Sequence, residues 1–407
     1  MIQEERLAKV ALTPDLLWPI EQYKKEGLYF YLEATKDILP NGRVNVENRG
    51  EMVMLGSYSY LGLIGHPKIN AAAKAAIDRY GTGTHGVRLL AGSLVLHNEL
   101  EERIARFKQT EAAITFSSGY VTNLATISGL LRKGDTVISD KLNHASIVDG
   151  CLLAMANHVR FRHNDMEHLE RRLQEARQGN PNGRVLVVAD AVFSMDGDII
   201  NLPEVHRLCK AYDAYLMIDE AHSIGVLGET GHGIEEHFGM PPDTIDIKMG
   251  TLSKTIPSGG GYIAGNNELI TFLKHEARAF IFSAAIPPAS AAAAKAAFDV
   301  IEEEPWRVKK VQANFRHFAR RLREAGFDLL NTETAILPVV CGDLDPAVLL
   351  ANHCQSNGIF VQAVVAPVVP VHLSRLRACV LAAHTTEDLD YCADTMIAGG
   401  RKFGIIK

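Results

Sequence analysis

Short apolar runs alternate with helix-like segments through the middle of the chain. The apolar runs have the length and residue types of buried strands, and they lie at Ala112–Phe116, Thr136–Ser139, Val185–Ala189 and Tyr215–Ile218. Ahead of them, Met52–Leu55 has strand character, whereas Asn70–Tyr80 and His97–Phe107 carry apolar residues at helical spacing. Strands that alternate with helices form a mostly parallel sheet covered on both faces. The pattern therefore predicts an α/β fold.

The pattern changes in the last third of the chain. Long helices are predicted there near Ala291–Glu303 and Val308–Ala325, followed by short strands near Ile336–Val340 and Phe360–Val364. The first residues are polar and helical in parts. We therefore expect an N-terminal arm at residues 1–50, a large domain at residues 51–290 and a smaller C-terminal α+β domain at residues 291–407.

Composition narrows the class of protein. The chain has 407 residues, of which 47% are hydrophobic and 22% charged, as in an ordinary globular protein with a large core. Its formal net charge of −6 gives no electrostatic reason to expect nucleic-acid binding. We expect no membrane span and no secretory signal, because no apolar run reaches about 18 residues and the first residues are charged. The six cysteines form no CxxC pair and no metal-ligand spacing, which favours a cytoplasmic protein without a metal site.

Two familiar motifs occur in the wrong context. Gly81–Gly86 matches GxGxxG, but a dinucleotide-binding loop follows a strand, and Asn70–Tyr80 is predicted to be a helix. Asp219–His222 spells the DEAH box of certain helicases, but the chain contains no GxxxxGK[ST] phosphate loop. These observations argue against a Rossmann dehydrogenase and exclude a helicase.

The most informative polar residues follow the predicted strands. Asp219 closes the strand at Tyr215–Ile218, and Lys254 lies between small hydroxyl residues and a run of glycines. In open parallel sheets, ligands bind beyond the carboxyl ends of the strands. Taken singly, a strand-end acid or a lysine in a glycine-rich loop is usually an ordinary surface feature. Their order on an α/β scaffold points to a shared pocket.

Pyridoxal-5′-phosphate (PLP) chemistry needs such a set of residues. It requires a lysine that forms a Schiff base, a carboxylate that keeps the pyridine nitrogen protonated, backbone amides that hold the phosphate and a ring that stacks on the cofactor. The sequence offers Lys254, Asp219, the turn around Ser118–Tyr120, and His144 for these roles. We therefore interpret the chain as a PLP enzyme. A non-enzymatic protein with vestigial PLP binding stays open, although the presence of Lys254 weakens it.

At these residues the chain resembles the α-oxoamine synthase family of fold-type-I PLP enzymes. The resemblance runs from about Tyr29 to about Gly400, and its most specific motifs are Ser59–Leu63, Asn143–Ser146, Phe193–Asp198, Asp219–Ser223, Gly250–Lys254, and Leu376–Arg377 with Ala382–Thr385. It implies decarboxylative condensation of an amino acid with an acyl thioester such as acyl-CoA, giving an α-amino ketone and CO2. Within the family, the serine palmitoyltransferases of sphingolipid biosynthesis look most similar. A 7-keto-8-aminopelargonate synthase, another specialised α-oxoamine synthase, and an aminotransferase or lyase on the same fold are the alternatives.

The resemblance also implies roles for individual residues. Lys254 would bind the cofactor aldehyde, Asp219 the pyridine nitrogen and His222 the phenolic oxygen, with His144 stacked on the ring. The phosphate would be held by Ser118, Gly119, Tyr120 and Thr251, and by Ser283 reaching across a homodimer, while Asp190 and Ser194 would line the pocket. Arg377 would bind the amino-acid carboxylate. Tyr58 stands in the substrate site where most bacterial members carry an asparagine that helps to hold that carboxylate.

Overall fold

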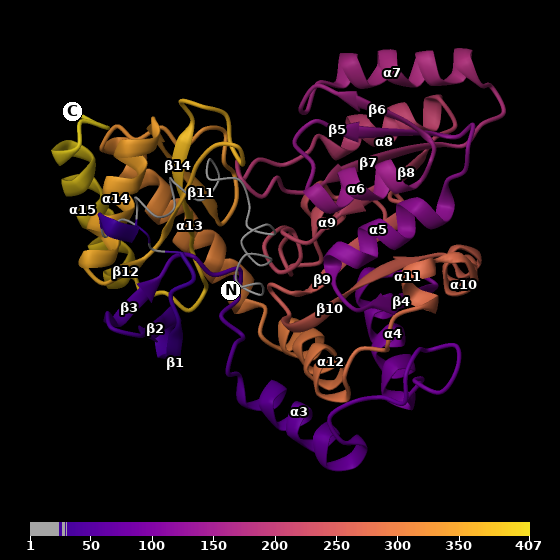
Figure 1. The fold of residues 1–407 in the computed structure, drawn as a ribbon, viewed down its shortest axis with the longest axis horizontal. Helices are drawn as coiled ribbons and strands as arrows, with labels where there is room; N and C mark the ends of the chain where they lie inside the picture. Colours follow the sequence, from indigo (N-terminus) through magenta and orange to yellow (C-terminus); the bar gives the residue numbers. More distant parts are fainter. Residues whose placement is uncertain (1–23, 27–28, 30) are drawn as a thin grey trace, which may run out of the picture.

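The large sheet has seven strands in the order β4-β10-β9-β8-β7-β5-β6 (Figure 1). The computed structural model describes residues 24–26, 29 and 31–407. Strands β9, β8, β7, β5 and β6 are parallel to one another, and β10 runs antiparallel to both of its neighbours. In the order of the sheet, the strands are β4 (Ala112–Phe116), β10 (Pro257–Gly265), β9 (Ile247–Ser253), β8 (Tyr215–Asp219), β7 (Val185–Asp190), β5 (Thr136–Asp140) and β6 (Asn157–Phe161). The mostly parallel α/β sheet expected from the sequence is confirmed.

Helices cover both faces of this sheet. Side chains alternate along each strand, so in β7 Val187 and Ala189 join one buried cluster, whereas Leu186 and Val188 join the other. The first cluster is completed by α4 (Val95–Lys108), α7 (Met166–Gly179), α8 (Leu202–Ala211) and α12 (Pro288–Glu303). The second is completed by α5 (Gly119–Leu130), α6 (Ala145–Leu153), α10 (Asn267–Glu276) and α11 (Arg278–Ile281). The continuous apolar strands in the sequence are explained by this two-sided burial.

Two smaller sheets form the second part of the molecule. One has the order β11 (Ile336–Gly342), β14 (Ser374–Cys379) and β13 (Gln362–Val364), and the other has β1 (Thr35–Leu39), β2 (Arg43–Val46), β3 (Gly50–Met54) and β12 (Ile359–Phe360). They lie with α13 (Trp306–Glu324), α14 (Leu344–Ser356) and α15 (Thr386–Lys402) (Figure 1). The remaining named elements of the described residues are the long helix α3 (Pro67–Tyr80), the short helix α9 (Ile234–His237) and the 3-10 turn Pro40–Gly42.

The N-terminal segment differs from the expected arm. Within residues 1–50, most of the first 30 lie outside the described residues, and the next segment forms β1 and β2 rather than helix. Strand β3 pairs with β2 on one side and in parallel with β12 on the other, so one sheet joins strands that the expected boundaries at residues 51 and 291 separate. Helix α12 likewise packs against α3, α4 and β10, although the expected boundary at residue 291 assigned most of this helix to the C-terminal domain. Both differences arise from contacts distant in sequence, which local periodicity does not report.

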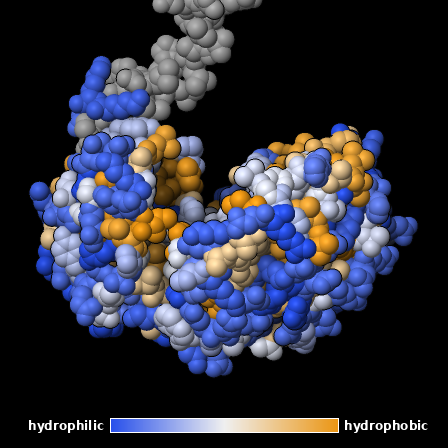
Figure 2. Space-filling view, turned by 90° about the horizontal axis from the view of Figure 1, so that it is seen from below, coloured by the Kyte–Doolittle hydropathy of each residue, from blue (hydrophilic) through white to orange (hydrophobic). Residues whose placement is uncertain are grey.

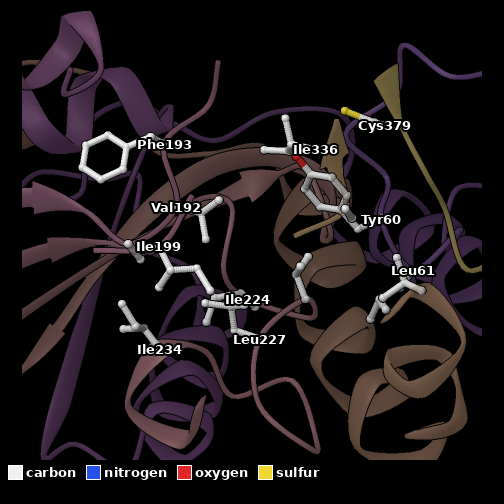
Figure 3. Close-up of a cluster of buried hydrophobic side chains, with 14 of the residues drawn as sticks. Tyr60, Leu61, Val192, Phe193, Ile199, Ile224, Leu227, Ile234, Ile336 and Cys379 are labelled. Atoms are coloured by element: carbon white, nitrogen blue, oxygen red, sulfur yellow. The ribbon is translucent and has the colours of Figure 1, made fainter. Parts of the chain in front are cut away.

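The space between the two parts is lined by apolar and polar groups. A space-filling view shows apolar residues around a hollow between two halves of the molecule (Figure 2). In the core, a buried apolar cluster includes Tyr60, Phe193, Ile224 and Ile336 (Figure 3). Within the part of the chain that the structure describes, no helix is both long and apolar enough to cross a membrane.

Candidate active site

Asp219 lies at the carboxyl end of β8, as the strand pattern predicted. Its side chain is buried, and its Oδ2 accepts a 2.7 Å hydrogen bond from Asn123 Nδ2, while Oδ1 accepts one of 2.9 Å from the backbone N–H of Ala221. Asn123 belongs to α5 and also donates to Ser146 Oγ at 2.9 Å. These bonds leave a fixed carboxylate at the sheet edge. Asn123 was not identified as a site residue from the sequence. A signal for it existed, because Asn123 lies four residues after Gly119 and therefore on the same face of α5.

Lys254 and His222 are in direct contact. Lys254 follows β9, and its Nζ lies 2.9 Å from His222 Nε2. Burial lowers the pKa of Lys254 to about 8, against the opposing influence of Asp219 and Asp190. A lysine with this pKa is partly neutral near pH 8 and can act as a nucleophile or a base.

His222 is buried and held by two polar partners. Its Nδ1 lies 2.7 Å from the hydroxyl of Tyr60, opposite the contact with Lys254. Burial and the nearby Lys254 and Arg377 hold the pKa of His222 well below its ordinary value, so the ring is neutral. If the Tyr60 hydroxyl donates to Nδ1, the proton of His222 lies on Nε2 and points into the site. The sequence had placed Tyr60 in a motif without assigning it a role.

His144 and Asp190 lie beside this group. The backbone N–H of His144 donates to Asp190 Oδ2 at 2.8 Å, and its Nδ1 lies 2.7 Å from Ser146 Oγ. Burial lowers the pKa of His144, although Asp219 opposes the shift. Burial and the neighbouring Asp219 raise the pKa of Asp190 well above its ordinary value. His144 is therefore a neutral ring fixed at the start of α6.

The N-terminus of α5 can bind an anion. Ser118 caps the helix by accepting a 3.2 Å hydrogen bond from Val121 N–H, and the helix begins at Gly119 and Tyr120. A Cβ on Gly119 would lie 2.9 Å from Thr251 Oγ1, so only glycine allows this approach to Thr251. The first N–H groups of a helix have no partner within the helix and attract phosphate. The Tyr120 hydroxyl instead points to Asp149.

Arg377 lies in β14 and faces Tyr58. Its Nε donates to the backbone carbonyl of Ser194 at 2.6 Å, and its Nη1 lies 3.0 Å from Cys379 Sγ. Within the described residues, Nη2 is buried without a hydrogen-bond partner. The guanidinium carbon is 4.7 Å from the centre of the Tyr58 ring, and Lys254 Nζ is 5.7 Å from the same centre. A ligand carboxylate beside Tyr58 can therefore take up the free donor of Arg377.

The Ser194 and Ser283 side chains make none of the contacts described above. Ser194 contacts Arg377 through its backbone carbonyl, not its side chain. Ser283 follows α11 and lines a small cavity with Ser117 and Phe280, and none of the contacts above connects it with Lys254. The other predicted site residues, from Tyr58 to Arg377, meet at the edge of the large sheet.

The residues present fit PLP. Lys254 can bond the aldehyde, the fixed Asp219 carboxylate can face a pyridinium nitrogen, and the α5 N-terminus beside Thr251 can hold a phosphate. The unpartnered Nη2 of Arg377 marks the side where a second anion belongs. Among the residues that the structure describes, no group of three or more His, Cys, Asp or Glu side chains could hold a metal ion.

Comparisons with known proteins agree with this geometry. Residues 50–396 match the family model for class I and II aminotransferases. The 8-amino-7-oxononanoate synthase of Geobacter sulfurreducens is 43% identical over 97% of this chain and 100% of its own, and that of Symbiobacterium thermophilum is 41% identical over 98% and 100%. Among solved structures, the Sphingomonas wittichii serine palmitoyltransferase has a TM-score of 0.91 at 32% identity, covering 98% of this chain and 100% of its own. A structure of SPT with PLP has a TM-score of 0.92 at 31% identity, covering 97% and 100%.

The chain therefore belongs to the class I and II aminotransferase family of PLP-dependent, fold-type-I proteins. Within that family it is an α-oxoamine synthase, an acyltransferase that condenses an amino acid with an acyl thioester and releases CO2. The two solved structures above are serine palmitoyltransferases, the subgroup that looked most similar from the sequence. The curated relatives are instead named 8-amino-7-oxononanoate synthase, and they do not support a role in sphingolipid biosynthesis.

Proposed function

We propose that this α-oxoamine synthase joins alanine to a seven-carbon dicarboxylic acyl thioester, giving 8-amino-7-oxononanoate. One observation carries the choice. Eight curated relatives named 8-amino-7-oxononanoate synthase are 41–43% identical over 89–98% of this chain, whereas the SPT structures are 30–32% identical. 8-Amino-7-oxononanoate is the same compound as 7-keto-8-aminopelargonate, so these relatives match the 7-keto-8-aminopelargonate synthase alternative that the sequence left open.

The substrates follow from the structure of that product. Its C8 carries the amino group and a methyl group, so C8 and C9 are the α- and β-carbons of alanine. Its C7 ketone is the former thioester carbonyl, and C1 to C7 form a pimeloyl chain ending in a carboxylate. A bond forms between the α-carbon and the thioester carbon, and the C–S bond breaks. The alanine carboxylate leaves as CO2, the α-carbon that it leaves takes up a proton to replace the one removed before the new bond formed, and the departing thiolate takes up another proton.

The active-site residues supply binding and proton transfer. When bound to Lys254, PLP provides the electron sink that stabilises negative charge at the amino-acid α-carbon. We assign Asp219 to its pyridine nitrogen, His222 Nε2 to its phenolic oxygen, and the α5 N-terminus with Thr251 to its phosphate. His144 covers the ring. Ser118, Gly119 and Tyr120 belong to the phosphate site, and Asp190 and the carbonyl of Ser194 line its surroundings.

Arg377 and Lys254 act on the amino acid. Arg377 Nη2 binds the alanine carboxylate and so fixes the direction of the Cα–H bond. Lys254 Nζ takes the proton from that carbon, and its pKa of about 8 suits a general base near neutral pH. Tyr58 covers the guanidinium with an aromatic face. An aromatic face in place of an amide favours the methyl group of alanine over the hydroxyl of serine.

We also propose a homodimer in which Ser283 serves the neighbouring site. A backbone bridge between Val87 and Ala284 brings two loops together. These loops carry Leu90, which is 87% exposed, and Phe282, which is 74% exposed. Large apolar side chains gathered on one surface favour an interface with another chain.

A two-by-two substrate test distinguishes the candidates. The purified holoenzyme is given alanine or serine with pimeloyl-CoA or palmitoyl-CoA, and free thiol is measured. We expect thiol release with alanine and pimeloyl-CoA to exceed that of the other three pairs at least tenfold. Preference for serine and palmitoyl-CoA would support the serine palmitoyltransferase alternative and overturn the proposal. Formation of pyruvate from alanine without thiol release would identify an aminotransferase.

A further inference from the structure

One turn connects the large sheet with the strand that carries Arg377. The bridging turn, Phe193–Asp198, follows β7 and is closed by hydrogen bonds from Phe193 N–H to Asp198 O at 3.1 Å and from Gly197 N–H to Phe193 O at 2.8 Å. Phe193 lies on one side of the buried cluster, and Ile336 and Cys379 of the C-terminal strands lie on the other (Figure 3).

The C-terminal strands hold the bridging turn tightly. Arg375, whose side chain is buried, forms an ion pair with Asp196 and donates to the carbonyl of Met195 at 3.1 Å. Thr334 Oγ1 donates to the carbonyl of Gly197 at 2.9 Å. Gly197 has φ +76°, and a Cβ there would lie 2.4 Å from the carbonyl oxygen of Ile336, so a larger residue would separate the turn from β11.

Asp198, the last residue of the bridging turn, is held by a histidine. His163 Nε2 lies 2.8 Å from Asp198 Oδ2, and its Nδ1 lies 3.0 Å from Asp140 Oδ1. Asp140 ends β5 and also accepts hydrogen bonds of 2.8 Å from the N–H groups of Leu142 and Asn164. Burial disfavours the charged imidazole, but the two carboxylates outweigh it and raise the pKa of His163 to about 10.

The bridging turn is therefore held on the side of the large sheet by the ion pair between His163 and Asp198, and on the side of the small sheet it contacts Arg377. Ser194, inside the turn, offers its carbonyl to Arg377 Nε at 2.6 Å. His163 links Asp140 to Asp198, the Asp198 carbonyl accepts a hydrogen bond from Phe193 N–H, and Ser194 is the next residue along the chain. A buried guanidinium that loses one acceptor must turn to find another. Movement of the turn would thus change the direction in which Nη2 points.

We propose that His163 is a positioning residue for amino-acid binding. Its imidazolium joins two carboxylates that would otherwise repel each other, and it fixes the bridging turn so that the Ser194 carbonyl orients Arg377. The inference rests on the proposed function, in which Arg377 binds the alanine carboxylate. His163 itself touches neither the substrate nor the cofactor.

The first test replaces the imidazolium by a neutral amide. In the His163→Gln holoenzyme, the new amide can donate to Asp140, but its oxygen faces the Asp198 carboxylate. Alanine affinity is measured by titrating the change in cofactor absorbance, with PLP content determined for each preparation. We expect the alanine Kd to rise about 3- to 30-fold at unchanged PLP content and unchanged KM for the thioester. His158→Gln is the matched control, because His158 bonds Ser139 Oγ at 2.8 Å and does not touch the turn.

A rescue variant separates positioning from general damage. In the double variant His163→Gln/Asp198→Asn, the new Asn amide can donate to the new Gln oxygen and rebuild the link, so alanine affinity should return to within about threefold of the wild type. Wild-type alanine affinity in His163→Gln, alongside lost affinity in Arg377→Ala, would overturn the inference and leave the proposed function intact. Loss of PLP content without rescue would also overturn it. Unchanged affinity in Arg377→Ala would instead refute the role of the arginine itself.

Discussion

Removal of the Arg377 guanidinium should weaken amino-acid binding much more than PLP binding. Arg377 has one donor bonded to Ser194 O, one near Cys379 Sγ, and a buried Nη2 without a partner among the described residues. The site is therefore built for one further acceptor in a desolvated place. Truncating one partner of a buried charge pair costs about 2–5 kcal/mol. Arg377→Ala should thus raise the alanine Kd by about 30-fold to a few thousand-fold.

The assay is an equilibrium titration of the holoenzyme with alanine, followed by the change in cofactor absorbance. Arg375→Ala is the control, because Arg375 lies on the same strand but already pairs with Asp196. We expect its effect on alanine affinity to be the smaller of the two, and its effect on thermal stability the larger. Equal alanine affinity in Arg377→Ala and the wild type, or a greater loss in Arg375→Ala, would show that the wrong arginine was chosen.

Three further outcomes follow from other contacts. Because burial lowers the pKa of Lys254 to about 8 and only the neutral amine attacks an aldehyde, PLP capture by the apoprotein should accelerate as pH rises through about 8; a rate independent of pH would contradict this. Lys108 Nζ and Glu220 Oε2 are 2.6 Å apart and nearly unexposed, so Lys108→Met should lower the free energy of unfolding by about 3–5 kcal/mol. The double variant Lys108→Met/Glu220→Gln should recover most of this loss in thermal melts. An equally large loss in the double variant would refute the pairing. If Ser283 serves the neighbouring site, mixing inactive Lys254→Ala and Ser283→Ala chains should restore activity, provided that the Ser283 change is itself disabling, and sedimentation of a fully active monomer would count against it.

The sequence predicted the large sheet because burial on two faces leaves a strong local signature. The run Val185–Ala189 is apolar at every position, and the structure buries alternate side chains in two different clusters. Asp219 and Lys254 could be located for a related reason, since residues just after parallel strands must meet at one edge, whereas the role of His222 came from the family resemblance. Arg377 came from the family resemblance, and the structure places it beside Tyr58.

Other features could not be predicted because they depend on distant partners. The pairing of β3 with β12 joins Val53 to Ile359, and no periodicity records such a contact. Helix α5 was expected only as a phosphate turn, so the hydrogen bond from Asn123 to Asp219 was missed. The His163 link between Asp140 and Asp198 joins three segments, and neither the strand pattern nor the family motif at Phe193–Asp198 records that these side chains meet.

The condensation itself is tested most directly by the fate of one carbon. The enzyme is incubated with pimeloyl-CoA and alanine labelled with ¹³C in the carboxylate, and both the gas and the product are examined by mass spectrometry. We expect one labelled CO2 for each CoA released and an unlabelled nine-carbon amino ketone. The labelled carboxylate carbon is lost as CO2, whereas the α-carbon of alanine stays bonded to the acyl carbon. Label retained in the product, or pyruvate formed without CoA release, would contradict the account.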